Sequence, residues 1–207
     1  MDTAVKTRVG ILGGAFNPPT IGHLELAQAA VARKAVDEVW ITPCLGHAFG
    51  KQLVDYDHRV KMCALMLPIS SLNSPSKMSV FSYEETLNLT SGHTYDFITQ
   101  LLADPLFAAY EFSYIIGQDN ADTINSWYRY EDLLKMIPFL VFPRVGEGGL
   151  QEWYRNPPHQ VFPHAHISDT SSTAVRDNLV NKNLKQACAM LHPSVAGYIE
   201  YYNLYLS

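Results

Sequence analysis

The sequence predicts an α/β protein built on a doubly wound parallel sheet. Short apolar runs alternate with helix-like segments along the chain, which is typical of parallel strands joined by helical crossovers. Successive apolar runs end in polar or glycine-containing loops, and open parallel sheets bind ligands at such loops. No repeat, low-complexity tract or linker divides the chain, so we expect residues 1–207 to form a single domain.

The first elements form a β-α-β unit. An apolar run at 8–12 stops at Gly13 and Gly14, which predicts a strand, and the Ala- and Leu-rich segment 22–32 predicts a helix. A second strand is predicted at 36–43, where apolar and polar residues alternate and a proline ends the run. Such a unit implies parallel strands with a right-handed crossover.

The later elements continue this alternation. They are predicted as helices at 58–67 and 94–102 and as strands at 111–116 and 139–142. From Ser172 onward the sequence predicts two helices, with a break near His192 and Pro193.

Charge and cysteine usage narrow the functional classes. The chain has 15 basic and 20 acidic side chains, a formal net charge of -5, which argues against a nucleic-acid or membrane-surface binder. The three cysteines are widely separated and include no CxxC pair, so we expect a reducing, cytoplasmic compartment. The N-terminus lacks the apolar core of a secretory signal, and no apolar run approaches the roughly 20 residues that span a bilayer.

The loop after the first strand carries the strongest chemical signal. Gly13 and Gly14 permit the main chain to approach a bulky anion, and a helix that begins near Gly22 directs its N–H groups to the same place. Thr20 and His23 add a hydroxyl and a ring N–H as phosphate donors. We therefore predict a phosphate site; a tight turn with a capping threonine and a surface histidine is the structural alternative.

A second anion site is predicted late in the chain. Ser171, Ser172 and Thr173 are residues typical of a helix N-cap. Arg176 lies one turn into the same helix, where a guanidinium can clamp a phosphate at two points. A plain capped surface helix is the alternative interpretation of this segment.

The two segments together resemble the motifs of a known enzyme family. The residues at 20–23, Thr-Ile-Gly-His, resemble the (T/H)xGH signature of the nucleotidyltransferase superfamily, and those at 171–176 resemble the SSTxxR motif of the nicotinate or nicotinamide mononucleotide adenylyltransferases. The loop at 115–120 is similar to the IGxD loop of that family. The resemblance implies a Rossmann-like nucleotidyltransferase fold and a role in NAD biosynthesis, with ATP and a pyridine mononucleotide as substrates and Mg²⁺ carried by ATP.

Residue roles follow from the resemblance. The catalytic residues are expected to be His23, Thr20, Arg176 and Lys51. The ATP-binding residues are expected to be Gly13, Gly14, Ala15, Phe16, Gly22, His23, Gly117, Asp119, Ser172, Thr173 and Arg176. The mononucleotide-binding residues are expected to be Asn17, Thr94, Trp127, Tyr128 and Arg144. Among these, Trp127 offers an indole face that suits a pyridinium ring, although a single tryptophan is more often a core anchor.

No dedicated metal site is expected. His159, His164 and His166 lie near a proline-rich loop without a carboxylate or cysteine at ligand spacing, so they are interpreted as a surface cluster. In the expected reaction, both the attacking group and the departing group are phosphates. We therefore expect Mg²⁺ to be held mostly by the substrate and by water.

Two other functions stay open on the sequence. Another small-molecule nucleotidyltransferase, of the phosphopantetheine or alcohol-phosphate type, would share the first loop. A non-catalytic nucleotide-binding sensor would keep the binding loops. The sequence does not distinguish nicotinate from nicotinamide mononucleotide, and it is compatible with a homo-oligomer.

Overall fold

A parallel sheet forms the centre of the protein. The computed structural model describes residues 5–48, 50, 52–68, 77–143, 150–163, 165 and 167–206. Within these residues a six-stranded sheet has the order β3-β2-β1-β4-β5-β6, and all of its pairings are parallel. Its strands are β1 (Thr7–Gly14), β2 (Glu38–Pro43), β3 (Met78–Val80), β4 (Tyr110–Gly117), β5 (Phe139–Phe142) and β6 (Gln160–Val161). This is the doubly wound order, with its switch point between β1 and β4, and it confirms the predicted fold class.

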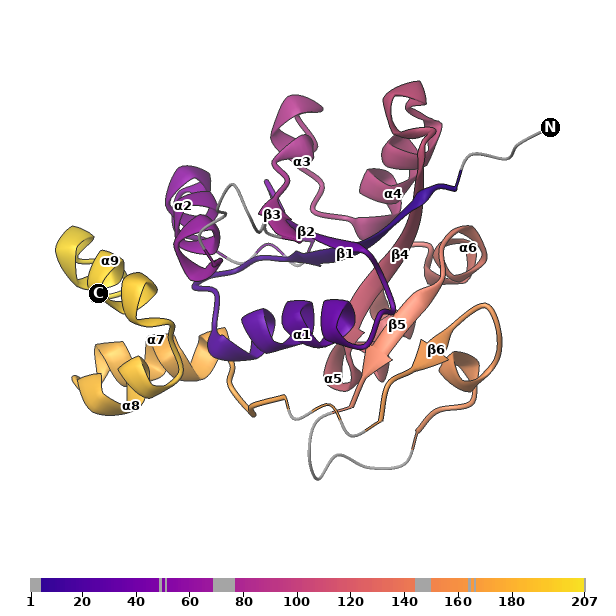
Figure 1. The fold of residues 1–207 in the computed structure, drawn as a ribbon. Coiled ribbons are helices and arrows are strands. Elements are labelled where there is room, and N and C mark those ends of the chain that lie inside the picture. Colours follow the sequence, from indigo (N-terminus) through magenta and orange to yellow (C-terminus); the bar gives the residue numbers. More distant parts are fainter. Residues whose placement is uncertain are drawn as a thin grey trace.

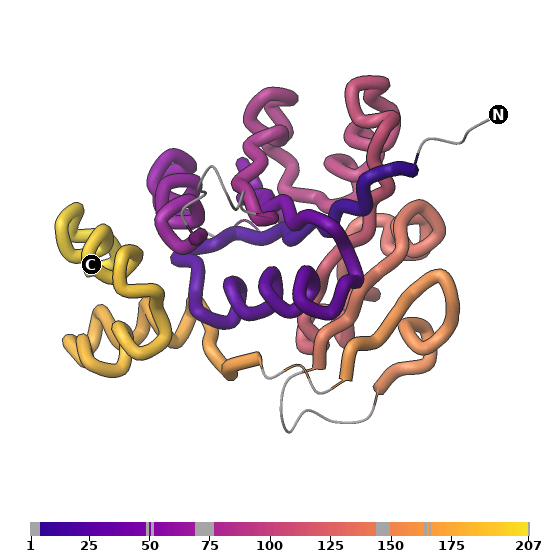
Figure 2. Tube along the Cα trace, viewed as in Figure 1, coloured from indigo at the N-terminus to yellow at the C-terminus, as the bar shows by residue number. Residues whose placement is uncertain are grey.

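Helices cover both faces of the sheet, with α1 on one side and α4 on the other (Figure 1). The helices are α1 (Ile21–Ala32), α2 (Tyr56–Met66), α3 (Tyr83–Thr86), α4 (Thr94–Ala103), α5 (Gln118–Ala121), α6 (Tyr130–Met136), α7 (Ser172–Val180), α8 (Leu184–Ala189) and α9 (Pro193–Tyr202). The last three gather at one side of the molecule (Figure 2). None of the described helices combines the length and the apolar character needed to cross a membrane.

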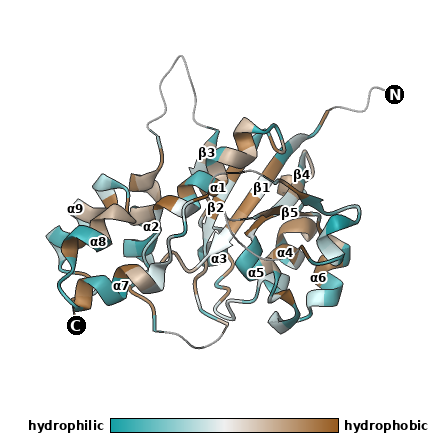
Figure 3. Cartoon of the chain, turned by 90° about the horizontal axis from the view of Figure 1, so that it is seen from below, coloured by the Kyte–Doolittle hydropathy of each residue, from teal (hydrophilic) through white to brown (hydrophobic). Residues whose placement is uncertain are grey.

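Two apolar cores sandwich the sheet, and strand β1 carries hydrophobic colour in Figure 3. Leu12 of β1 packs with α1, α2 and the C-terminal helices in one core. Val9 and Ile11 of the same strand pack with α4 and α6 in the other. Because both faces of a parallel strand are buried, β1 is a continuous apolar run rather than an alternating one.

Strand β1 extends two residues beyond its predicted end and one before its predicted start, so it includes both glycines. Gly13 pairs with Thr42 and Gly14 with Pro43 on β2. A Cβ on Gly13 would collide with the hydroxyl of Tyr114, which crosses from β4. The glycine therefore lets a tyrosine from the neighbouring strand lie beneath the loop that follows β1.

Some elements differ from the sequence prediction. Strands β3 and β6 were not predicted; they hold three and two residues and pair at the two edges of the sheet. The C-terminal segment forms three helices rather than two, because α7 ends at Val180 and Lys182 adopts a positive φ of 59° before α8 begins. Helix α2 begins at Tyr56, two residues before the predicted start at 58.

Candidate functional site

A cleft of about 890 Å³ lies at the carboxyl ends of β1, β2 and β4, beside the switch point of the sheet. Its lining includes the predicted residues Gly13, Gly14, Ala15, Phe16, Asn17, Thr20, Gly22, His23, Thr94, Gly117, Asp119, Trp127, Tyr128, Ser172, Thr173 and Arg176. The structure thus brings the separate sequence motifs together in one cleft. The predicted residues Lys51 and Arg144 lie outside the described residues.

The imidazole of His23 is oriented by the residue that precedes α1. Its Nδ1 accepts a hydrogen bond from the backbone N–H of Thr20 at 2.9 Å, and the Thr20 hydroxyl lies at 2.9 Å from the same nitrogen. An Nδ1 that accepts from a backbone N–H leaves the ring proton of neutral histidine on Nε2. The Phe16 ring packs edge-on against the imidazole, with centroids 5.0 Å apart. His23 is therefore held in the tautomer that has an N–H on the far side of its ring.

The first N–H groups of α1 bind within the protein, which corrects one sequence prediction. The Gly22 N–H donates to Oγ1 of Thr170 at 3.1 Å, and the Ile21 N–H donates to the carbonyl of Met190 at 2.9 Å. The Thr170 hydroxyl donates in turn to Oγ1 of Thr20 at 3.1 Å. These two N–H groups were expected to face a phosphate, but segments from the C-terminal third occupy them.

Gly22 still has a clear reason to be a glycine. A Cβ there would lie 2.8 Å from Oγ1 of Thr170 and 3.1 Å from the carbonyl oxygen of Ser168. The segment 168–170 is fixed further by Glu25, which accepts from the Ser168 N–H at 2.6 Å and from its hydroxyl at 2.9 Å. Gly22 thus allows α1 to pack directly against the chain that leads into α7.

The start of α7 is tied to the loop after β1. Ser171 caps the helix, since its Oγ accepts from the Ala174 N–H at 3.1 Å. The Ser172 hydroxyl donates to the carbonyl of Pro18 at 2.7 Å. Ser172 lines the cleft, but in this structure its proton is directed at the first loop.

The Arg176 guanidinium, on the second turn of α7, lines the cleft. Its Nη1 donates to the carbonyl of Asn17 at 2.7 Å, and its Nη2 donates to Oγ1 of Thr173 at 3.3 Å. A guanidinium has five N–H donors, so these two bonds orient the group and leave donor capacity for an anion.

Asn17, expected to bind the mononucleotide, is a buried junction between distant segments. Its Oδ1 accepts from the Val54 N–H at 3.1 Å and from the Tyr205 hydroxyl at 3.0 Å. Its backbone carbonyl accepts from Arg176. Asn17 lines the cleft, and its side-chain oxygen fixes the loop between β1 and α1.

Aromatic residues gather on the opposite side of the cleft, around the start of α4. The Trp127 ring packs edge-on against Tyr114, with centroids 6.0 Å apart. The Tyr128 ring packs against His93 at 4.6 Å with a tilt of 33°. Burial raises the pKa of Tyr114, whose hydroxyl is hydrogen-bonded to Thr94. Tyr114 and His93 also line the cleft, beside the predicted residues Thr94, Trp127 and Tyr128. Sequence reasoning did not identify these two residues.

The loop after β4 is a compact turn in which Asp119 lies over Gly117. Asp119 lies in the short helix α5, and a Cβ on Gly117 would lie 2.7 Å from its Oδ1. Only a glycine lets the carboxylate fold back over the end of β4 in this way. Both residues line the cleft, as predicted.

Sequence reasoning also missed Arg59 and Glu84, two buried ionisable residues next to the cleft. Arg59, Met62, Cys63 and Met66 are the buried residues of α2. Their i, i+3, i+4, i+7 spacing defines the apolar face of a helix. A cation at a core position of that pattern is the signal that could have identified Arg59, whereas no comparable local signal marks Glu84.

His159 is one of the three histidines interpreted as a surface cluster, and it makes specific contacts. The imidazole is half-buried, its Nδ1 accepts from the Phe139 N–H at 3.1 Å, and burial lowers its pKa. The ring also packs edge-on against Trp153 at 5.2 Å. His164 and His166 lie outside the described residues. Among the residues that the structure does describe, no group of three or more His, Cys, Asp or Glu side chains is placed to hold a metal ion.

Fold and site together define a nucleotide-binding protein of the doubly wound α/β class. The cleft lies at the switch point, an oriented histidine and an arginine lie on one side, and an aromatic group lies on the other.

Comparison with known proteins identifies the family within this class. The family model for cytidylyltransferase-like proteins matches residues 11–178. A probable nicotinate-nucleotide adenylyltransferase of Myxococcus xanthus is 34% identical over 173 residues, which cover 83% of this chain and 82% of that protein. The nicotinate-nucleotide adenylyltransferase of Bacillus subtilis is 29% identical over 203 residues, covering 97% and 99% of the two chains.

A solved structure agrees with these sequence matches. Plasmodium falciparum nicotinic acid mononucleotide adenylyltransferase complexed with NaAD matches with a TM-score of 0.80 and 25% identity, covering 96% of this chain and 97% of that one. The chain belongs to the cytidylyltransferase-like family, and the relatives named above are nicotinate-nucleotide adenylyltransferases.

Proposed function

We propose that the protein is an adenylyltransferase that joins ATP and nicotinate mononucleotide to give deamido-NAD and pyrophosphate, a step in NAD biosynthesis. The observation that carries this proposal is the cleft itself, which unites the His23 ring, the start of α7 with Arg176, and the aromatic group around Trp127. The names of the similar proteins support it. We further propose that residues 1–207 act as one nucleotidyltransferase domain.

The reaction needs no nucleophilic side chain. A 5′-phosphate oxygen of the mononucleotide attacks the α-phosphorus of ATP and forms the new P–O bond. The bond between the α-phosphorus and the oxygen that bridges to the β-phosphorus breaks in line, and pyrophosphate leaves with that electron pair. Because the attacking phosphate is ionised near neutral pH, the protein contributes by positioning two polyanions and by stabilising the charge on the transferring group.

The oriented side chains supply that stabilisation. The Nε2–H of His23 donates to an oxygen on the α-phosphorus, where charge develops in the transition state. Arg176 and the first turn of α7 hold the departing pyrophosphate, since a guanidinium and a helix N-terminus both favour anions. Thr20 holds the His23 ring, and Lys51 stays a proposed second cation.

A divalent metal accompanies the reaction as part of the substrate. We propose that it is Mg²⁺, which prefers oxygen ligands and keeps several waters when it binds nucleotide phosphates. In the described part of the chain no cluster of acidic, His and Cys side chains forms a cage for such an ion. We propose that the ATP phosphates and water hold this metal.

We propose that the pyridine side of the cleft, which is lined by Thr94, Trp127 and Tyr128, favours nicotinate over nicotinamide. Helix α4 begins at Thr94, which lines the cleft, so the positive end of the helix dipole lies next to the aromatic group. A carboxylate gains more from a helix N-terminus than a neutral carboxamide does.

Pyrophosphate release with ATP and each mononucleotide in parallel tests the proposal. We expect the nicotinate form to have a kcat/KM roughly 10-fold higher or more, a difference of about 1.4 kcal/mol. Equal values would contradict the preference for nicotinate. Failure of both mononucleotides would contradict adenylyl transfer to pyridine substrates, and activity with phosphopantetheine instead would favour the related transferase.

The proposed reaction requires neither nucleic acid nor a membrane as partner. A cytoplasmic location and assembly into a homo-oligomer stay predictions of the sequence. Light scattering on the purified protein measures its oligomeric state directly.

A further inference from the structure

We propose that Arg59 and Glu84 are positioning residues that clamp the peptide group between Cys44 and Leu45 from both sides and thereby fix the turn 44–48 as a wall of the mononucleotide side of the cleft. The identity of the affected substrate rests on the proposed function, whereas the geometry of the clamp does not.

Arg59 binds backbone carbonyls from separate segments around the cleft. Its side chain is 1% exposed. Nη1 donates to the carbonyls of Ala15 and Cys44 at 2.8 Å each, Nε donates to Val54 at 2.9 Å, and Nη2 lies 3.5 Å from the carbonyl of Leu45. A planar fork of five donors suits this arrangement, and a lysine could not reproduce it.

Glu84 holds the other side of the same peptide. It lies on α3, is 8% exposed and lines the cleft. Its Oε2 accepts from the Leu45 N–H at 2.8 Å. The peptide group between Cys44 and Leu45 thus contacts a carboxylate through the Leu45 N–H and a guanidinium through the Cys44 carbonyl. A peptide between two opposite charges is held more firmly than one between neutral partners, because charge-assisted hydrogen bonds are stronger.

The clamped turn interlocks with the segment that leads into α4. A Cβ on Gly46 would collide with the carbonyl oxygen of Thr90. A Cβ on Gly92, which has a φ of 65°, would lie 2.6 Å from the backbone nitrogen of Ala48. The contacts are backbone against backbone, so the turn cannot shift without moving the residues that precede Thr94.

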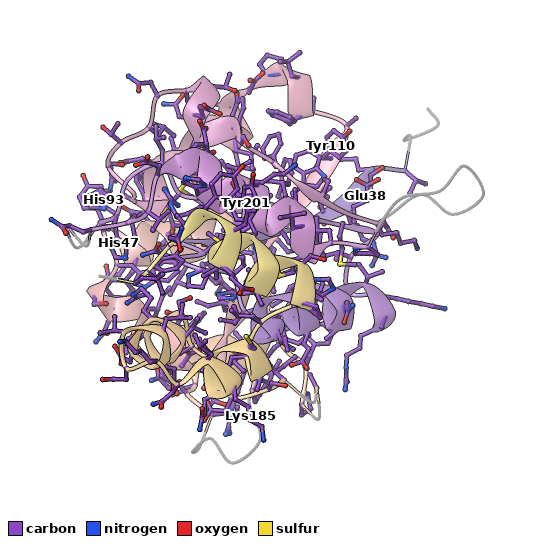
Figure 4. The ribbon with its side chains drawn as sticks, turned by 90° about the vertical axis from the view of Figure 1, so that its left-hand side faces the viewer. Glu38, His47, His93, Tyr110, Lys185 and Tyr201 are labelled. Carbon is purple, nitrogen blue, oxygen red and sulfur yellow. The ribbon has the colours of Figure 1, made fainter. Side chains whose placement is uncertain are left out.

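Both sides of this interlock face the cleft. His47 and Ala48 of the turn, and His93 and Thr94 at the start of α4, all line it. Figure 4 shows His47 and His93 close together at one edge of the molecule. The clamp therefore acts on the pyridine side, through the positions of residues that contact the substrate in the proposed complex.

The electrostatic surroundings make the clamp sensitive to pH. Burial raises the pKa of Glu84 to about 7, while the Leu45 N–H and Arg59 oppose that rise. The other titratable groups around this carboxyl are Cys44 after β2, Tyr56 on α2, Tyr114 on β4 and the neighbouring Glu85. Burial raises the pKa of Cys44 to about 11 and that of Tyr56 to about 12, so both are neutral near pH 7. As the pH falls, Glu84 loses its charge, and the bond to Leu45 loses its charge assistance.

Three variants separate the clamp from a merely structural role. Glu84→Ala removes the acceptor, and Glu84→Gln keeps an acceptor but removes the charge. Arg59→Lys keeps a cation but loses the fork. Glu85→Gln is the matched control, because Glu85 is the exposed neighbour of Glu84 on α3.

Steady-state kinetics give the first readout. We expect Glu84→Ala to raise the KM of nicotinate mononucleotide about 10-fold, as expected for loss of a charge-assisted hydrogen bond, with the KM of ATP changed less than about twofold. Arg59→Lys also loses the bond to the Ala15 carbonyl in the predicted ATP loop, so it should raise both KM values. The ratio of kcat/KM between wild type and Glu84→Gln should increase as the pH rises through about 7, and the corresponding ratio for Glu85→Gln should stay flat. Equal changes in both KM values for Glu84→Ala, or a flat ratio for Glu84→Gln, would overturn the proposal.

Hydrogen exchange gives a second readout that requires no activity. We expect peptides spanning 42–48 to exchange faster in Glu84→Ala, and those from α6 to be unchanged, in a variant whose thermal melting stays cooperative. If Glu84→Ala does not fold, Arg59→Lys serves the same measurement. Unchanged exchange in the turn would refute the clamp. If the wild-type protein shows no adenylyl transfer, the proposed function is refuted, but the hydrogen-exchange test of the clamp still holds.

Discussion

Replacing His23 by alanine and by asparagine separates its two roles. The ring accepts from the Thr20 N–H through Nδ1 and presents its own N–H at Nε2. Alanine removes both atoms. The oxygen of asparagine lies where Nδ1 lies, so asparagine restores the acceptor but not the donor. Thr20 is 1% exposed, which makes the loss of its acceptor costly.

The expected magnitudes follow from these two bonds. A buried N–H without an acceptor costs about 1–3 kcal/mol. In a protein of this size the melting temperature of His23→Ala should fall by roughly 2–12 °C, since each kcal/mol corresponds to about 2–4 °C. His23→Asn should melt close to wild type. Both variants should lose about 100-fold to 1000-fold in kcat, the usual cost of removing one donor to a developing oxyanion.

Calorimetry and pyrophosphate release provide the two measurements. The KM of the mononucleotide should change little in either variant, because the missing donor acts on the transferring phosphorus. A His23→Asn protein that turned over at near-native rate would remove the Nε2–H from the mechanism. A His23→Ala protein with a native melting temperature would show that the Thr20 contact contributes nothing to stability.

Three further outcomes are expected. Trp127→Ala should raise the KM of the mononucleotide roughly 10-fold by steady-state kinetics, as expected for loss of ring stacking, and Trp153→Phe, outside the cleft lining, should not; equal effects would refute stacking at Trp127. Thr170→Val removes the acceptor of the Gly22 N–H and should lower the free energy of unfolding by about 1–3 kcal/mol in urea titrations; an unchanged midpoint would contradict this. Glu84 has a pKa of about 7, above its usual value, so its contribution to stability is present at low pH and is lost as the pH rises through about 7. The melting temperature of Glu84→Gln relative to wild type should therefore increase between about pH 5 and pH 8, and a constant difference would contradict the burial effect.

The buried strands were predictable because their sequences are decisive on their own. Strand β5 is four buried apolar residues bounded by prolines, and β1 is an apolar run closed by glycines. Strands β3 and β6 were not predictable, because three and two residues carry no periodicity. Their pairing to β2 and β5 is decided by the tertiary fold.

The site shows a similar division between local and long-range information. The segments 20–23 and 171–176 carry their chemistry in adjacent residues, so their place at the cleft was predictable. The direction of the Ser172 hydroxyl and the partner of the Gly22 N–H were not, because the partners lie 154 and 148 positions away. Glu84 was missed for the same reason, since its partner Leu45 lies 39 positions earlier.

The hydrogen bonds of Asn17 set an order for assembly of the site during synthesis. The residue lies near the start of the chain, but its carbonyl is bound by Arg176 and its side chain by Tyr205, 159 and 188 positions later. Contacts across such separations are costly to form and come late in folding. The ribosome thus releases the loop after β1 long before the residues that complete it. A chain cut short before α7 lacks both Arg176 and Tyr205, so the Asn17 carbonyl and side chain lose these partners and the loop after β1 loses two of its anchors.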